Sequence, residues 1–156
     1  MTRTACAPAS TVLSIDVEKA MSGSLIATEL VDFVRANQGR APLVYSSSRP
    51  EQVTALQEKY SREAVARKLD SLFADAAKRL FDAGVRRIVV GGGETSGAVV
   101  SALGVTSFRI GPEIDSGVPV LVSEDGVKLG MALKSGNFGA IDFFEKALDA
   151  ISGVSV

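Results

Sequence analysis

Apolar residues recur along the chain with two different spacings, and these spacings predict alternating strands and helices. Over residues 61–83 an apolar residue returns every three or four positions, so we predict one long amphipathic helix that the following glycine ends. Residues 17–36 show the same spacing with one Ser-Gly-Ser interruption, which predicts two shorter helices. The apolar runs at 11–16 and 42–48 are predicted strands, and Pro50 opens a helix after the second one.

Residues 86–110 are predicted to form a strand, a helix and a second strand. The segments 86–90 and 105–110 carry apolar runs, and residues 95–103 between them fit a helix. Continuously apolar strands are typical of parallel strands that are buried on both faces. We therefore expect a βαβ unit with glycines at the carboxyl end of its first strand, where open α/β sheets bind ligands.

The C-terminal part of the chain predicts a hairpin and a last helix. Asp125-Gly126 lies between two apolar runs, as in type I′ hairpins, and residues 127, 129, 131 and 133 are expected to point inward. Residues 140–151 are a predicted helix with an apolar face formed by Ile141, Phe144, Leu148 and Ile151. We expect an α/β fold of three layers: a mostly parallel, mixed sheet with helices on both faces and a β-hairpin near the C-terminus.

The totals fit one folded domain. The chain has 156 residues, of which 46% are hydrophobic and 22% charged, so a sizeable core is expected. Residues 1–10 are weakly patterned and are expected to be a poorly ordered tail, with residues 11–156 forming a single domain.

The charge balance, the single cysteine and the absence of histidine exclude several classes of partner and of chemistry. The 17 Lys and Arg balance 18 Asp and Glu without blocks of one sign, which argues against nucleic acid and anionic membranes. With a single cysteine and no secretory pattern at its start, the protein is expected in the cytoplasm. There is no histidine, so Ser-His-Asp and Cys-His chemistry is excluded.

The glycine-rich stretch GGGETSG, residues 91–97, is the first candidate binding site. It matches neither common phosphate loop: Ser96 stands where the dinucleotide fingerprint needs its third glycine, and Ala98 stands where Walker A has lysine. Bare backbone amides followed by Thr95 and Ser96 at a helix start nevertheless favour an anion such as phosphate. The alternative is a tight strand-to-helix turn with Thr95 as N-cap and small residues for close packing.

KSGNFG, residues 134–139, is a second glycine-rich turn at a strand end. Lys134 could place a positive charge on a phosphate, with Ser135, Asn137 and nearby amides as further donors. The alternative is an ordinary loop with a solvated lysine.

Carboxylates near these turns are candidate metal ligands. Glu113 and Asp115 are expected in a loop after a third strand, where they could hold Mg²⁺, and Glu94 could do the same or order the glycine turn. Most loop carboxylates are simply solvated. Serines 46–48 could contact a ligand or cap the helix that follows.

Three linked motifs, VVGGGETSGAVVSALGV, RIGPEIDSGVPV and MALKSGNFGAIDFFEKAL, resemble the C-terminal, nucleotide-binding domain of the four-carbon acid sugar kinase family. The resemblance extends over about residues 42–148 and includes PLVYSSSRPEQV. It implies a domain that binds ATP, with Mg²⁺, while a separate N-terminal domain holds a threonate-like or 3-dehydrotetronate-like acid for phosphorylation of its terminal hydroxyl. The residues implied at the nucleotide are Gly92, Gly93, Glu94, Thr95, Ser96, Gly97, Lys134, Ser135, Gly136, Asn137 and Phe138.

The resemblance also sets limits. The family's N-terminal domain and the Ser-rich turn that opens its nucleotide domain have no counterpart here, so we expect the chain alone to be inactive and the catalytic base to lie elsewhere. Apolar surface normally covered by that domain could pair two copies in a homodimer. Two alternatives remain open: a stand-alone nucleotide or anion sensor, and an effector-like interaction protein.

Overall fold

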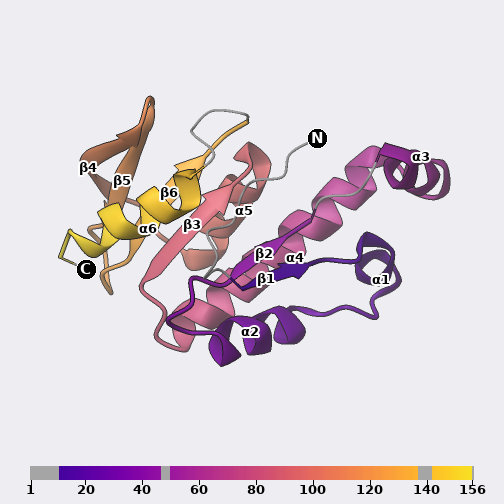
Figure 1. Cartoon of the computed structure of the whole chain (residues 1–156), viewed down its shortest axis with the longest axis horizontal. Coiled ribbons are helices and arrows are strands. Elements are labelled where there is room, and N and C mark those ends of the chain that lie inside the picture. The colour runs from indigo at the N-terminus through magenta and orange to yellow at the C-terminus, as the bar shows by residue number, and fades with distance from the viewer. Residues whose placement is uncertain (1–10, 47–49, 137–141, 156) are drawn as a thin grey trace.

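The computed structural model describes residues 11–46, 50–136 and 142–155 (Figure 1). Its elements in chain order are β1 (Val12–Ser14), α1 (Val17–Ser22), α2 (Ala27–Ala36), β2 (Leu43–Tyr45), α3 (Pro50–Lys59), α4 (Arg62–Asp82), β3 (Arg87–Gly91), α5 (Gly93–Leu103), β4 (Phe108–Asp115), β5 (Val118–Ser123), β6 (Gly130–Lys134) and α6 (Phe143–Ser152). The two short helices, the helix opened by Pro50 and the long helix α4 all lie where the sequence predicts them.

The described strands form two sheets. β1 and β2 pair in parallel, with Leu13 opposite Val44. The larger sheet has the strand order β3-β6-β5-β4, in which β3 and β6 are parallel while β5 is antiparallel to both of its neighbours. A mixed sheet is thus confirmed. The expectation of a mostly parallel one is wrong for the larger sheet, because β4, β5 and β6 follow one another through short connections that reverse the chain.

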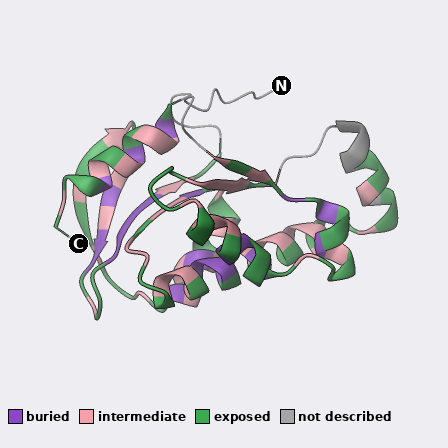
Figure 2. Cartoon of the chain, turned by 60° about the horizontal axis from the view of Figure 1, so that its bottom comes forward, coloured by how far each residue is buried: buried purple, intermediate pink, exposed green. Residues whose placement is uncertain are grey.

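Helices cover both faces of the larger sheet, which confirms the three layers. α6 packs on one face against β5 and β6, and α5 packs on the other face and is backed by α4 (Figure 1). Figure 2 shows the buried positions along these strands and on parts of the helices. Burial of the apolar side chains between the layers is the main stabilising contribution to such a fold.

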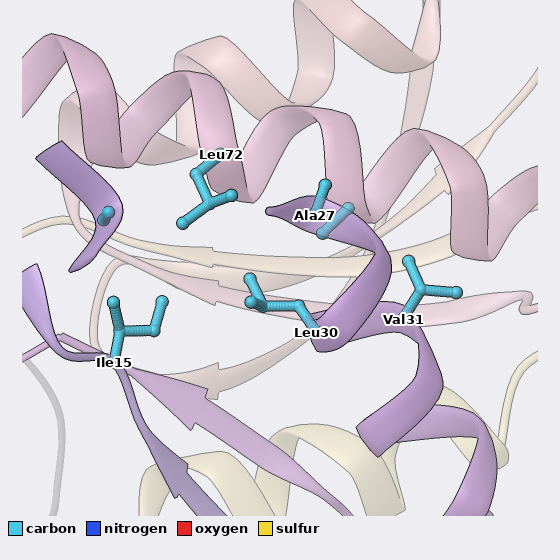
Figure 3. Close-up of a cluster of buried hydrophobic side chains, with 7 residues drawn as sticks. Ile15, Ala27, Leu30, Val31 and Leu72 are labelled. Carbon is cyan, nitrogen blue, oxygen red and sulfur yellow. The ribbon is translucent and has the colours of Figure 1, made fainter. Parts of the chain in front are cut away.

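The long helix α4 joins the two sheets. The Ser61 hydroxyl caps its start by accepting from the backbone N–H of Ala64 at 3.2 Å, and Gly84 follows its end with φ at +102°. Along α4, Ala77 packs under the larger sheet. Other α4 residues complete the cluster beneath the small sheet, which consists of Ile15, Ala20, Ala27, Leu30, Val31, Leu72 and Ala76 (Figure 3).

Strand β4 differs from the expected second strand of a βαβ unit. It does run in the same direction as β3, but β6 and β5 lie between them, and β4 forms an edge of the sheet. It is also longer than expected and continues through Gly111 and Pro112, and its Ile110 is 73% exposed. An edge strand tolerates proline because the N–H that proline lacks would face solvent there.

The expected type I′ turn at Asp125-Gly126 is wrong in its details. β5 and β6 are antiparallel, with Leu121 opposite Met131, so the predicted antiparallel pair exists. The type I′ turn requires positive φ at both central residues, whereas only Gly126 of the two has it, at +67°. The chain instead makes a longer loop in which Val127 is 54% exposed rather than inward-facing.

The tighter reversal lies between β4 and β5, where Gly117 has φ at +77°. Helix α6 begins at Phe143, and its buried residues are Phe143, Ala147 and Ile151. This face is centred one residue away from the predicted Phe144 and Leu148, both of which are only partly buried; Ile141 lies outside the described residues.

Candidate functional site

The two glycine-rich turns leave adjacent parallel strands at the same edge of the larger sheet. Gly91, the last residue of β3, lies opposite Lys134, the last residue of β6. The backbone N–H of Gly92 donates to the carbonyl of Lys134 at 2.7 Å, so one turn is tied directly to the other strand. The described candidate residues of both turns are therefore brought together at the carboxyl ends of two strands, where α/β sheets bind ligands.

The first turn depends on the backbone of Gly92. Its φ of +114° and ψ of 127° lie in a region that residues with a Cβ rarely adopt. Gly92 is the N-cap of α5, which begins at Gly93, so Thr95 lies inside the first helical turn and the expected role of Thr95 as N-cap is wrong. No side chain caps α5. The N–H groups of Gly93, Glu94 and Thr95 belong to the first turn and have no intrahelical acceptor.

The hydroxyls of the first turn are already used within the protein. Thr95 Oγ1 donates to Oδ1 of Asp70 on α4 at 2.5 Å, and Ser96 Oγ donates to the carbonyl of Gly92 at 2.6 Å. Ser96 is buried, at 8% exposure. The donors that the turn offers to a ligand are therefore backbone amides, at the positive end of the α5 dipole. Glu94 and Gly97 are exposed beside them.

The second turn brings a positive charge and a close backbone approach. Lys134 is half-buried, and its Nζ lies 5.8 Å from the centroid of the Phe143 ring and donates to the carbonyl of Gly136 at 3.1 Å. A Cβ added at Gly93 would lie 3.6 Å from Cβ of Ser135, so the two turns are in near contact. Asn137 and Phe138, the other residues implied in this turn, lie outside the described residues.

Asp70 is the residue that the sequence analysis missed. It lies 25 residues before Thr95 in a helix predicted only from its apolar spacing. Neither its spacing nor its neighbours form a motif, because the contact arises from the packing of α4 against α5. An alignment in which both positions keep a carboxylate and a hydroxyl would have been the signal to look for.

Glu113 lies away from the glycine turns. It is part of edge strand β4 rather than a loop, and its Oε1 accepts from the backbone N–H of Gly117 at 2.7 Å, which stabilises the β4–β5 reversal. Two strands separate β4 from β3, so at about 4.8 Å per strand their backbones are roughly 14 Å apart. Asp115 pairs with Lys146 at 3.9 Å. In the part of the chain that the structure describes, no group of three or more carboxylates or cysteines could hold a metal ion.

Other features lie outside this edge. Ser46 follows β2 in the small sheet, and residues 47 and 48 are not described. A hollow of about 350 Å³ opens between the α1–α2 connection and α4, lined by Gly23, Leu25, Ile26, Ala27, Thr28, Lys68, Ser71, Leu72, Asp75 and Arg79, none of which belongs to the glycine turns. Within the described ranges, every helix is too short or too polar to cross a membrane.

The chain is similar to known kinases. It is 45% identical over 141 residues to the 3-oxo-tetronate kinase of Burkholderia multivorans, a match that covers 90% of this chain and 33% of the relative. It is 40% identical over 137 residues to the 3-oxo-tetronate kinase of Haemophilus influenzae, covering 85% and 32% of the two chains. The chain thus spans about a third of the length of the relatives it matches.

Solved structures share the fold. A crystal structure of a Haemophilus influenzae protein has a TM-score of 0.83 and 36% identity, covering 90% of this chain and 34% of that one. A Bordetella bronchiseptica protein, crystallised with citrate as a domain-swapped dimer, has a TM-score of 0.65 at 20% identity and covers 91% of this chain and 35% of its own; at that identity the likeness shows the fold alone. The family model described as "Nucleotide-binding C-terminal domain" matches residues 2–144, which contain both glycine turns, and the chain therefore belongs to this family of nucleotide-binding domains.

Proposed function

We propose that this chain is the ATP-binding part of a four-carbon acid sugar kinase. The observation that carries the proposal is the pairing of Gly91 with Lys134, which brings two glycine turns of a nucleotide-binding family to one edge of the sheet. The similarity to 3-oxo-tetronate kinases supports a sugar acid of four carbons as the phosphate acceptor.

In this proposal the phosphates of ATP lie against the first turn of α5. The amides of Gly93, Glu94 and Thr95 donate to phosphate oxygens, and the Lys134 ammonium neutralises part of their charge. Gly92, Ser96 and Gly97 shape the turn, and Ser135 and Gly136 form the opposite wall. Mg²⁺ enters with the nucleotide, because it binds chiefly through phosphates and water, with few protein carboxylates.

Phosphoryl transfer is then a matter of positioning and charge neutralisation. Amides held rigidly at a helix start and one lysine are suited to stabilise the charge that develops on the transferred group. The sugar acid and the general base for its terminal hydroxyl belong, in this proposal, to the part of the kinase that corresponds to the remaining two thirds of the relatives. The chain alone is expected to bind ATP and to phosphorylate nothing.

The proposal is tested by calorimetric titration of the purified chain with ATP and Mg²⁺. Gly93→Val is expected to abolish saturable binding, because its branched side chain would occupy the space between the turn and Ser135. Gly153→Val is the matched control, because it makes the same substitution at a glycine outside the two turns. Gly153 follows α6 with ordinary helical φ and ψ, so this variant is expected to bind ATP like the wild type. Absence of ATP binding by the folded wild-type chain would contradict the proposal for the chain as it stands.

A further inference from the structure

Asp70 lies on α4, the long helix that packs against α5. Its Oδ1 accepts the hydroxyl proton of Thr95 at 2.5 Å, and both side chains are half-buried where α4 packs on α5. Charge-assisted hydrogen bonds of this kind are short and stronger than neutral ones. Because Oγ1 is bonded directly to Cβ, fixing this hydroxyl also fixes χ1 of Thr95 and ties the first helical turn to α4.

The turn is consequently held at two points. On the sheet side, the N–H of Gly92 donates to the carbonyl of Lys134 on β6. On the helix side, the Thr95 hydroxyl donates to Asp70 on α4. No side chain caps α5, so these contacts replace the usual N-cap as the means of orienting the first turn. The backbone N–H groups of residues 93–95 have no acceptor within α5, and the two contacts fix the direction in which they point.

We infer that Asp70 is a positioning residue of the nucleotide site, acting through Thr95 to orient the first-turn amides toward the phosphates. The inference rests on the proposed ATP-binding function and assigns a role to a residue on a different helix from the glycine turns. Asp70 is not a ligand contact in this account: its carboxylate faces Thr95, and its negative charge alone would repel a polyanion.

Two variants separate the hydrogen bond of Asp70 from its charge: both remove the charge, but only Asp70→Ala removes the acceptor. Asp70→Ala removes the acceptor, so the turn loses one of its two anchors and ATP affinity is expected to fall about tenfold, the equivalent of one hydrogen bond to a charged group. Asp70→Asn keeps an oxygen that can accept from Thr95 and removes the charge, so affinity is expected to stay at or above that of the wild type. Because asparagine also keeps the shape of aspartate, this rescue excludes a role of the charge, and the substitution Thr95→Val separates the hydrogen bond from packing.

The test is a double-mutant cycle on ATP affinity, measured by calorimetry with Mg²⁺ present. Thr95→Val removes the donor at nearly constant volume and is expected to match the loss in Asp70→Ala, whereas the double variant should lose about tenfold and not a hundredfold. Thr95→Ser, which retains the hydroxyl, should bind like the wild type. Asp82→Ala is the control on the same helix, because the Asp82 carboxylate forms an i,i+4 ion pair with Lys78. Thermal melting of each variant checks that it is folded.

The outcomes separate this inference from the proposed function. Equal losses in the two single variants, no further loss in the double variant and rescue by Asp70→Asn would support it. Unchanged affinity in Asp70→Ala and Thr95→Val, additive losses, or a loss in Asp70→Asn as large as in Asp70→Ala would overturn it while ATP binding by the wild type stands. If the folded wild-type chain binds no ATP, the proposed function fails and the inference fails with it.

Discussion

Two glycines of the same motif are expected to respond to alanine in opposite directions. Gly92 has φ at +114° and precedes α5, whereas Gly97 lies inside α5 with an ordinary helical φ. A Cβ at Gly92 would lie 3.4 Å from Thr95 Oγ1, while one at Gly97 would meet no atom within 4 Å. Backbone strain therefore acts only at the first position, and helix propensity only at the second.

The magnitudes follow from these conformations. A residue forced into so sparsely populated a region costs about 1–3 kcal/mol, so Gly92→Ala should lower the free energy of unfolding by that amount. Alanine in a helix interior is more stable than glycine by roughly 0.5–1 kcal/mol, so Gly97→Ala should raise it. The two variants should differ by about 1.5–4 kcal/mol, and at about 2–4 °C per kcal/mol their melting temperatures by at least about 3 °C.

Thermal and urea unfolding, followed by circular dichroism, measure both effects. A Gly92→Ala variant as stable as the wild type would refute the claim that this turn requires a glycine backbone. Gly97→Ala offers a second readout, because the family resemblance implies a contact of Gly97 with the nucleotide. A variant that is more stable but binds ATP more weakly would separate its role in binding from its role in folding.

Three further predictions concern single side chains. Lys134→Ala should weaken ATP binding in titrations, and more so at low salt because the lost interaction is electrostatic. Lys78→Ala, which removes a half-exposed lysine that pairs with Asp82 on α4, should leave ATP binding unchanged. Ser123→Ala should lower the free energy of unfolding in urea by about 1–3 kcal/mol without affecting ATP binding, because this fully buried hydroxyl accepts from the N–H of Leu129 at the opposite end of the sheet. Hydrogen bonds from the Thr106 side chain and N–H lower the pKa of Asp125 to about 2. Because the folded-state pKa lies below the unfolded value of about 3.9, the Asp125 carboxylate contributes its full stabilisation above a pH of about 3.9 and loses it as the pH falls through about 2. An NMR titration of the Asp125 carboxyl group with a midpoint near the unfolded value would contradict this.

Local patterns predicted the parts of the fold whose physics is local. The spacing of apolar residues predicts α4, and a glycine after its last turn predicts its end, because both depend on residues within one or two helical turns. The same holds for the glycines between β3 and α5, since a sharp strand-to-helix turn needs backbone conformations that Gly92 can adopt.

Strand order could not be read from the sequence. Residues 105–110 looked like a buried parallel strand, yet β4 is an edge strand, because its place depends on which strand pairs with β3. That place was taken by β6, more than twenty residues further along the chain. The glycine and proline at 111–112 looked like a loop for the same reason: their tolerance in a strand depends on an edge that only the tertiary structure creates.

For the candidate site, the sequence identified the two turns but not the hydrogen bonds that their side chains make. Both glycine turns were singled out, and the register of Gly91 with Lys134 brings them together. The hydroxyls of Thr95 and Ser96 were expected to face an anion, whereas both donate within the protein. The acceptor on Thr95 is Asp70, whose contact spans 25 residues and leaves no trace in local spacing.

The most direct test of the central claim is to map ATP binding on the backbone amides of the chain by NMR. The account predicts that, on addition of ATP and Mg²⁺, the largest shifts fall on residues 91–97 and 134–136, where the two turns meet. Asp82→Ala should give the same map, and Gly93→Val should give none. Shifts centred instead on the hollow around Ile26 and Lys68 would place the nucleotide elsewhere and contradict the account.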